Sequence, residues 1–176
     1  LAHHWREAGE PSRAFPYYLT AGGLALSRYA NTEARVRFNE AVEAASTTAQ
    51  KAEALLARAR VPGTRAEIQA DQSALIAIRD DVAAVGNDAL LAQVDYWIAR
   101  LHYIQGSLEE AITEARAAFE LAERAEGGAR VAADAANLLG RILAVQSKPL
   151  ESVKYIKRNI EQMAELGDDL ERAGIT

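Results

Sequence analysis

Apolar side chains recur along this chain with the spacing of an α-helix. In segment 88–105, Trp97, Ile98 and Leu101 lie three, four and seven residues after Val94, so the four share one helix face. No stretch alternates apolar and polar residues for long enough to form a strand. The pattern predicts an all-α protein with helices over about 1–8, 12–28, 32–47, 49–60, 65–85, 88–105, 108–126, 129–146 and 149–166, and a further one from 168.

Short breaks that contain glycine, proline or capping residues separate the predicted helices. Asn31 or Thr32 is expected to cap the helix that opens near residue 32. Ser107 and Glu110 form the S-x-x-E pattern of a capping box. Three glycines are expected to take the left-handed conformation that follows a helix: Gly106, Gly127 and Gly167. The last of these, Gly167, is expected to end the helix over 149–166.

The apolar pattern also repeats, at an interval of about 41 residues. A two-helix unit cannot bury its apolar stripe alone, and stacking of like units requires the stripe to recur at a fixed interval. In one helix of the unit, the 41-residue shift places Val94, Trp97, Ile98, Leu101 and Ile104 on Ala135, Leu138, Leu139, Ile142 and Val145. In the other helix of the unit, the same shift places Ala70, Ala74, Ala77, Ile78 and Gly86 on Ala111, Ala115, Ala118, Phe119 and Gly127. A further shift places Ala111, Ala115 and Phe119 on Ser152, Ile156 and Ile160.

The small and large residues within each unit resemble the tetratricopeptide repeat. In segment 92–122, Ile98-Ala99 stands where that family has Leu-Gly, and Gln105-Gly106-Ser107-Leu108 stands at its turn. The units are longer than the 34 residues of the family, and its terminal proline is missing. The resemblance implies a right-handed superhelix of antiparallel helix pairs that forms a single repeat domain over 1–176. Within it we expect irregular units over 1–48, repeats over 49–167 and a further helix that begins within 168–176.

The first residues carry a more specific likeness. Ala2-His3-His4, followed by Ala8-Gly9, resembles the start of the repeat region in large bacterial signalling proteins, which are adenylate/guanylate-cyclase-like and contain an ATPase module. The resemblance implies a fragment of a longer array that regulates such a protein by binding a protein or peptide segment, either of a partner or of its own parent chain. An alternative is an effector-sensing, small-molecule-binding repeat domain of an ATPase-type transcriptional regulator. Exposed apolar ends near 1–5 and 156–163 are expected to favour self-association.

In the repeat family, the first helix of each unit lines a concave groove. The resemblance therefore implies that the non-core residues of two helices face a ligand. The alternative is that Arg100 and Arg141 only form local ion pairs of little energetic value. The expected groove positions are Gln93, Tyr96, Arg100, Tyr103, Asp134, Asn137 and Arg141.

Composition narrows the range of functions. The net charge of −5 and the pI near 5.3 argue against nucleic-acid binding, which needs a basic face. No apolar run approaches the roughly 20 residues of a membrane span. The chain has no cysteine, which suits a reducing cytoplasm and excludes thiolate chemistry. The expected location is therefore cytoplasmic, with neither a membrane nor a nucleic acid as partner.

Neither catalysis nor metal binding is expected from this sequence. His3 and His4 are adjacent, so on a helix they point about 100° apart and cannot hold one ion. His102 has no accompanying nucleophile motif, and the paired carboxylates fall near helix ends, where solvation explains them. The chain has no phosphate-binding glycine loop. We therefore expect a binding module without catalytic residues, cofactor or metal.

Overall fold

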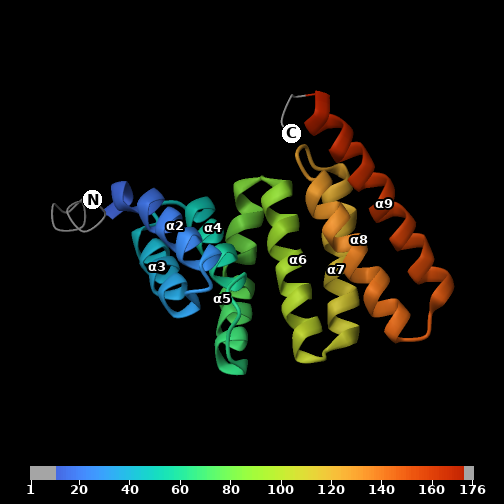
Figure 1. The fold of residues 1–176 in the computed structure, drawn as a ribbon, viewed down its shortest axis with the longest axis horizontal. Helices are drawn as coiled ribbons and strands as arrows, with labels where there is room; N and C mark the ends of the chain where they lie inside the picture. The colour runs from blue at the N-terminus through green and yellow to red at the C-terminus, as the bar shows by residue number, and fades with distance from the viewer. Residues whose placement is uncertain (1–10, 173–176) are drawn as a thin grey trace. The chain divides into compact units, whose positions relative to one another are not determined.

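The computed structural model of the chain describes residues 11–172, and within that range every regular element is a helix (Figure 1). This confirms the all-α prediction for the described residues. The helix predicted over 1–8 lies outside them. The helices are α2 (Pro11–Ser27), α3 (Asn31–Ala44), α4 (Thr48–Ala59), α5 (Arg65–Val85), α6 (Asp88–Gln105), α7 (Leu108–Arg124), α8 (Ala129–Val145) and α9 (Pro149–Arg172).

Glycine ends some of these helices and not others. Gly106 follows α6 directly with a φ angle of 85°, as predicted. Gly127 also has a positive φ angle, 76°, but α7 already ends at Arg124 with Ala125 as its extended C-cap, so Gly127 lies in the loop beyond the helix end. The predicted break at Gly167 is wrong, because α9 continues through it to Arg172. One glycine inside a helix costs only about 1 kcal/mol relative to alanine, so it does not by itself end a helix.

Two of the predicted helix caps are also wrong. Asn31 is already the first residue of α3, and Ala30, which precedes it, provides no side-chain cap. Ser107 precedes α7 but makes no capping hydrogen bond. Its ψ angle of 74° departs from the extended backbone that a capping side chain needs. Neither α3 nor α7 therefore begins with a side-chain cap from the residue that precedes it.

A capping box does form at the start of α5. The backbone N–H of Thr64 donates to Glu67 Oε2 at 2.7 Å, and the backbone N–H of Glu67 donates back to Thr64 Oγ1 at 3.3 Å. The Thr64 hydroxyl also donates to Glu67 Oε2, at 2.9 Å. This reciprocal pair satisfies two backbone donors that the first turn of a helix leaves without partners.

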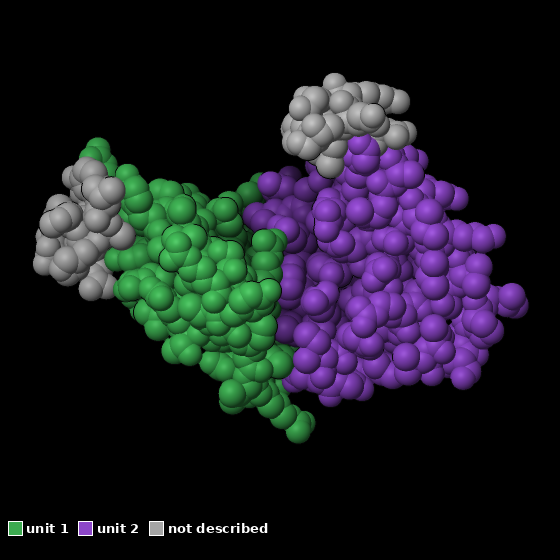
Figure 2. Space-filling model, viewed as in Figure 1, with its two compact units in different colours: residues 1–85 green, residues 86–176 purple. Residues whose placement is uncertain are grey.

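The chain divides into two compact units, Leu1–Val85 and Gly86–Thr176, called unit 1 and unit 2 here (Figure 2). Unit 1 holds α2 to α5, and unit 2 holds α6 to α9. Within each unit every helix packs against the next one along the chain. Helix α2 also touches α4, and α6 also touches α8, so each unit is a layered stack of helices.

Small residues let the helices approach closely in both units. In unit 1, a Cβ atom on Gly22 of α2 would lie 2.5 Å from the ring of Phe38 of α3, closer than atoms can pack. In unit 2, a Cβ atom on Gly140 of α8 would lie 2.7 Å from the side chain of Ile156 of α9. The hydroxyl of Ser152 donates to the Gly140 carbonyl at 2.8 Å across the same contact.

The core of unit 2 combines alanines with large aliphatic side chains. Ala111, Ala115 and Ala118 of α7 are fully buried, as expected for a close helix contact. They pack against aliphatic residues of α8: Leu138, Leu139, Ile142 and Leu143. Alanine on one helix and leucine or isoleucine on the other fill the space between two closely spaced axes.

Burial patterns recur along the chain, but with two different intervals. Helices α6 and α8 match at the predicted 41 residues, since Val94, Ile98 and Leu101 are buried and so are Ala135, Leu139 and Ile142. For α5 and α7 the predicted alignment is wrong by one residue. Ala70 and Ala77 are exposed, and the buried positions match at 40 residues: Asp71, Gln72, Leu75, Ile78 and Val82 with Ala111, Ile112, Ala115, Ala118 and Ala122.

One face of α9 carries exposed apolar side chains. Leu150 is 89% exposed and Ile160 is 62% exposed, and Val153, Ile156 and Met163 are exposed as well. Of the three α9 positions expected to repeat the α7 stripe, Ser152 is buried, whereas Ile156 and Ile160 are not. Self-association through this end of the chain stays a prediction, and residues 1–5 at the other end lie outside the described range.

The packing of α7 predicts the effect of enlarging one of its alanines. Ala115→Leu is expected to lower the free energy of unfolding by roughly 1–3 kcal/mol, because the added atoms have no space. Chemical denaturation followed by circular dichroism measures the change. Ala117→Leu is the matched control, since Ala117 is exposed on the same helix. Equal stability of the two variants would contradict the packing described for α7.

Candidate functional site

The expected groove residues lie on two helices of unit 2 that touch each other, α6 and α8. The guanidinium of Arg141, on α8, lies over the ring of Tyr103, on α6, with its carbon 5.5 Å from the ring centre. Arg141 and Asn137 are exposed, and Arg100, Tyr103, Gln93 and Asp134 are half-buried. The structure therefore brings the two halves of the expected site together through one cation–π contact.

Tyr96 was expected to face the groove, and this prediction is wrong because the residue is buried. It is only 8% exposed and belongs to the core of unit 2. Its hydroxyl accepts a hydrogen bond from Arg100 Nη1 at 3.3 Å. Trp97, expected to lie in the core, is only partly buried, and the Arg100 guanidinium lies over its ring at 5.2 Å. Because α6 packs against both α7 and α8, more of its circumference is buried than a single stripe predicts.

Local ion pairs do not account for Arg100 and Arg141. Among the described residues, neither guanidinium has a carboxylate partner, and both are held instead by aromatic rings. Asp134, which lies on the same helix as Arg141, pairs with Arg130 at 3.3 Å. Two guanidinium groups with unused N–H donors therefore remain on the α6/α8 face.

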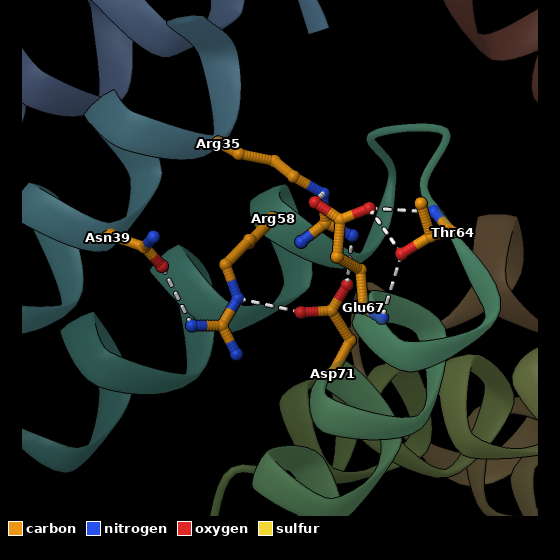
Figure 3. Close-up of polar contacts among 6 residues, drawn as sticks. All are labelled: Arg35, Asn39, Arg58, Thr64, Glu67 and Asp71. Carbon is orange, nitrogen blue, oxygen red and sulfur yellow. Dashed lines mark hydrogen bonds and ion pairs between the residues drawn. The ribbon is translucent and has the colours of Figure 1, made fainter. Parts of the chain in front are cut away.

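Unit 1 contains a cluster of charged side chains that the sequence analysis did not single out (Figure 3). Asp71 of α5 accepts hydrogen bonds from two arginines, one on each carboxylate oxygen. Arg35 of α3 donates through Nη2 to Oδ2 at 2.7 Å, and Arg58 of α4 donates through Nε to Oδ1 at 2.7 Å. The Asp71 side chain is 2% exposed, and those of Arg35 and Arg58 are 12% and 16% exposed. One buried carboxylate thus connects three helices, and this group is called the Asp71 cluster below.

Further contacts fix the position of each arginine. Arg58 Nη1 donates to Asn39 Oδ1 at 2.9 Å. Arg35 Nε lies 3.4 Å from Glu67 Oε1, an ion pair without the geometry of a hydrogen bond, so this buried Nε has no hydrogen-bond acceptor. A Cβ atom on Gly63 would lie 2.7 Å from Arg35 Nη2, so the residue that fits best at this point of the loop is glycine.

A comparison between the units shows that Asp71 is unusual for its position. At the equivalent place in α7, 40 residues later, the chain has the fully buried Ala111. Helix packing in this fold therefore does not require a carboxylate there. A buried charge is costly unless it is paired and hydrogen-bonded, which the two arginines provide. The cluster was missed because Arg35, Arg58 and Asp71 are far apart in sequence and form no motif.

Nowhere in the described part of the chain do three or more His, Asp or Glu side chains come close enough to hold an ion. His102 is half-buried on α6, and His3 and His4 lie outside the described residues.

None of the helices between residues 11 and 172 is both long and apolar enough to cross a membrane. No protein-family model and no curated protein matches this sequence.

Removal of the central carboxylate is expected to destabilise unit 1 strongly. Asp71→Ala leaves two largely buried guanidinium groups without their common partner, a loss of about 3 kcal/mol or more in the free energy of unfolding. Urea denaturation measures the loss. Asp80→Ala, at an exposed position of the same helix, is the matched control and is expected to change stability little. Equal effects would show that the cluster contributes nothing beyond surface charge.

The capping box of α5 is expected to respond to acid. The hydrogen bond from the Thr64 backbone N–H, and then that from the Thr64 hydroxyl, hold the pKa of Glu67 below its ordinary value, and the Arg35 charge acts in the same direction. A lowered folded-state pKa stabilises the fold above the ordinary glutamate pKa, and the contribution is lost as the pH falls through the folded-state value. As the pH falls over this acid range, the free energy of unfolding of Glu67→Gln is expected to decrease less than that of the wild-type chain.

The measurement is the midpoint of urea denaturation at a series of pH values between neutral and acid. Glu53→Gln is the matched control, because Glu53 is an exposed carboxylate of α4. Identical pH profiles for the wild-type chain and Glu67→Gln would show that the Thr64 hydrogen bonds do not distinguish the two charge states of Glu67.

Proposed function

We propose that this chain is a tetratricopeptide-like solenoid, a right-handed superhelix of antiparallel helix pairs that binds a protein or peptide segment. Three observations support the proposal. Consecutive helices pack in order within each unit, α6 also packs against α8, and burial in α6 and α8 recurs at 41 residues. Stacked helix pairs with a recurring buried stripe are characteristic of helical-repeat proteins. Such arrays present extended surfaces to their partners.

The observation that carries the binding proposal is the state of two arginines in unit 2. Arg100 and Arg141 lie over the rings of Trp97 and Tyr103, and the described residues offer neither of them a carboxylate. A guanidinium held by a ring keeps its remaining N–H donors oriented for a bidentate bond to a carboxylate. The ligand would be an extended acidic segment or a free C-terminus.

The wider role follows from the resemblance to large bacterial signalling proteins. In this proposal the solenoid belongs to an adenylate/guanylate-cyclase-like protein and controls its output by binding a partner or another segment of the same chain. The second candidate is an effector-sensing repeat domain of an ATPase-type transcriptional regulator. A pocket beside the Asp71 cluster favours it, because a small ligand needs a concave site with a few oriented polar groups.

The peptide proposal predicts a specific loss of binding. Glutamate-rich peptides with a free C-terminus are the probe, and lysine-rich peptides of equal length are the control ligand. Arg100→Ala and Arg141→Ala are each expected to weaken binding by at least about 2 kcal/mol, or roughly 30-fold in Kd, as for a contact that carries most of an interface's energy. Fluorescence anisotropy measures the Kd values.

Arg116→Ala is the matched control variant. Arg116 is exposed on α7, pairs with Glu151 of α9 at 2.8 Å and is not one of the expected groove residues. It is expected to bind the acidic peptides as the wild type does. Intact binding in Arg100→Ala and Arg141→Ala, or loss of binding in Arg116→Ala alone, would place the binding surface elsewhere.

A further inference from the structure

An open pocket of about 450 Å³ lies in unit 1, beside the Asp71 cluster. Helix α3 forms one side, the start of α5 forms the other, and the end of α4 also contributes. Its lining combines the polar side chains of the cluster with three apolar residues, Val36, Pro62 and Ala70. The pocket therefore has a charged part and an apolar part within the span of one small molecule.

Three donor groups on residues that line this pocket have no acceptor within the described part of the chain. Asp71 engages only one edge of each guanidinium, and within the described part of the chain Nη1 of Arg35 and Nη2 of Arg58 donate to no side chain or carbonyl. The Nδ2 amide group of Asn39, whose oxygen is bound to Arg58, also lacks an acceptor. All three residues line the pocket. Such a set of oriented donors matches the oxygens of an anion.

The charges of the cluster indicate which anion fits. Arg35 and Arg58 are balanced by Asp71 and Glu67, so the pocket wall is close to neutral. A neutral wall with outward-facing donors suits a singly charged carboxylate better than a multiply charged phosphate. The planar fork of a guanidinium also matches a carboxylate, and the apolar residues provide contact for a carbon chain.

A purely structural role leaves part of the arrangement unexplained. The fully buried Ala111 occupies the equivalent position in unit 2, so a carboxylate is not needed for the helices to pack. What Asp71 does is hold two arginines rigidly at the edge of a pocket. Donors fixed in this way lose little conformational entropy when a ligand binds.

We propose that this pocket of unit 1 binds a small organic acid, with the outer edges of Arg35 and Arg58 gripping its carboxylate and Val36, Pro62 and Ala70 contacting its carbon chain. Asp71 is a positioning residue in this site, since it acts through the two arginines. The inference does not depend on peptide binding by unit 2, because the two sites share no residue.

The test uses the full 176-residue chain and three probes: butyrate, the neutral and nearly isosteric butyramide, and inorganic phosphate. Heteronuclear NMR follows the Nε–H signals of Arg35 and Arg58 during each titration. Butyrate is expected to shift both signals saturably, and butyramide is expected to bind about tenfold more weakly or not at all, since it lacks the charge.

Ala70→Phe tests the location without touching the ion pairs. Ala70 is exposed in the pocket wall, so a phenyl ring there fills the space while the Asp71 contacts stay. It is expected to weaken butyrate binding about tenfold or more. Ala77→Phe, at an exposed position further along α5, is the matched control and is expected to bind as the wild type does.

Three results would overturn the proposal. One is the absence of a saturable shift with butyrate, and another is equal binding of butyrate by Ala70→Phe and the wild-type chain. The third is binding of phosphate more tightly than butyrate, which would assign the site to inorganic anions instead. Arg100→Ala, in the other unit, is expected to leave butyrate binding unchanged whatever its effect on acidic peptides.

Discussion

Close approach of helix backbones over small side chains is the constraint on which both units depend. Glycine occupies points where even a Cβ atom would collide with a side chain of the neighbouring helix, as at Gly22 against Phe38 and at Gly140 against Ile156, and fully buried alanines of α7 belong to the core of unit 2. Dispersion forces weaken steeply with distance, so short separations make these faces cohesive although each alanine buries little area. The cost is low tolerance, because an added methyl group at such a point displaces a neighbouring helix.

Asp71 departs from this pattern, and the departure creates the most specific feature of unit 1. At the position where unit 2 has Ala111, a buried carboxylate recruits arginines from two other helices. Ion pairs of this kind add little net stability over a well-packed apolar residue, but they fix the geometry of the groups involved. The arginines of unit 2 show a different solution, since aromatic rings rather than a carboxylate hold Arg100 and Arg141. Each unit thus presents oriented guanidinium groups by its own means.

Much of the helical fold could be predicted from the sequence, because apolar periodicity and glycine punctuation are local signals. Gly106 ended α6 as predicted, whereas α7 ended three residues before Gly127 and α9 continued through Gly167, since a single glycine only slightly weakens a helix. Capping chemistry was less predictable. Ser107 and Thr64 both begin an S/T-x-x-E pattern, but only Thr64 forms the capping hydrogen bonds.

The candidate sites could be predicted only in part. Recurrence along α6 and α8 identified Arg100 and Arg141, but the burial of Tyr96 depends on how many neighbours α6 has, which periodicity does not report. The Asp71 cluster joins residues of three helices and has no local pattern. Its one signal in the sequence was a pair of polar residues, Asp71 and Gln72, at places that are apolar 40 residues later.

Glu67 gives the first turn of α5 a role beyond the helix itself. The same carboxylate caps that turn through Thr64 and lies against Arg35 in the pocket wall. Local opening of this turn and loosening of Arg35 are therefore parts of one event rather than two. A molecule that immobilises Arg35 would slow the exchange of the backbone amides around Thr64 with solvent deuterium. The backbone at the start of α5 would then report, through its dynamics, on the occupancy of the pocket.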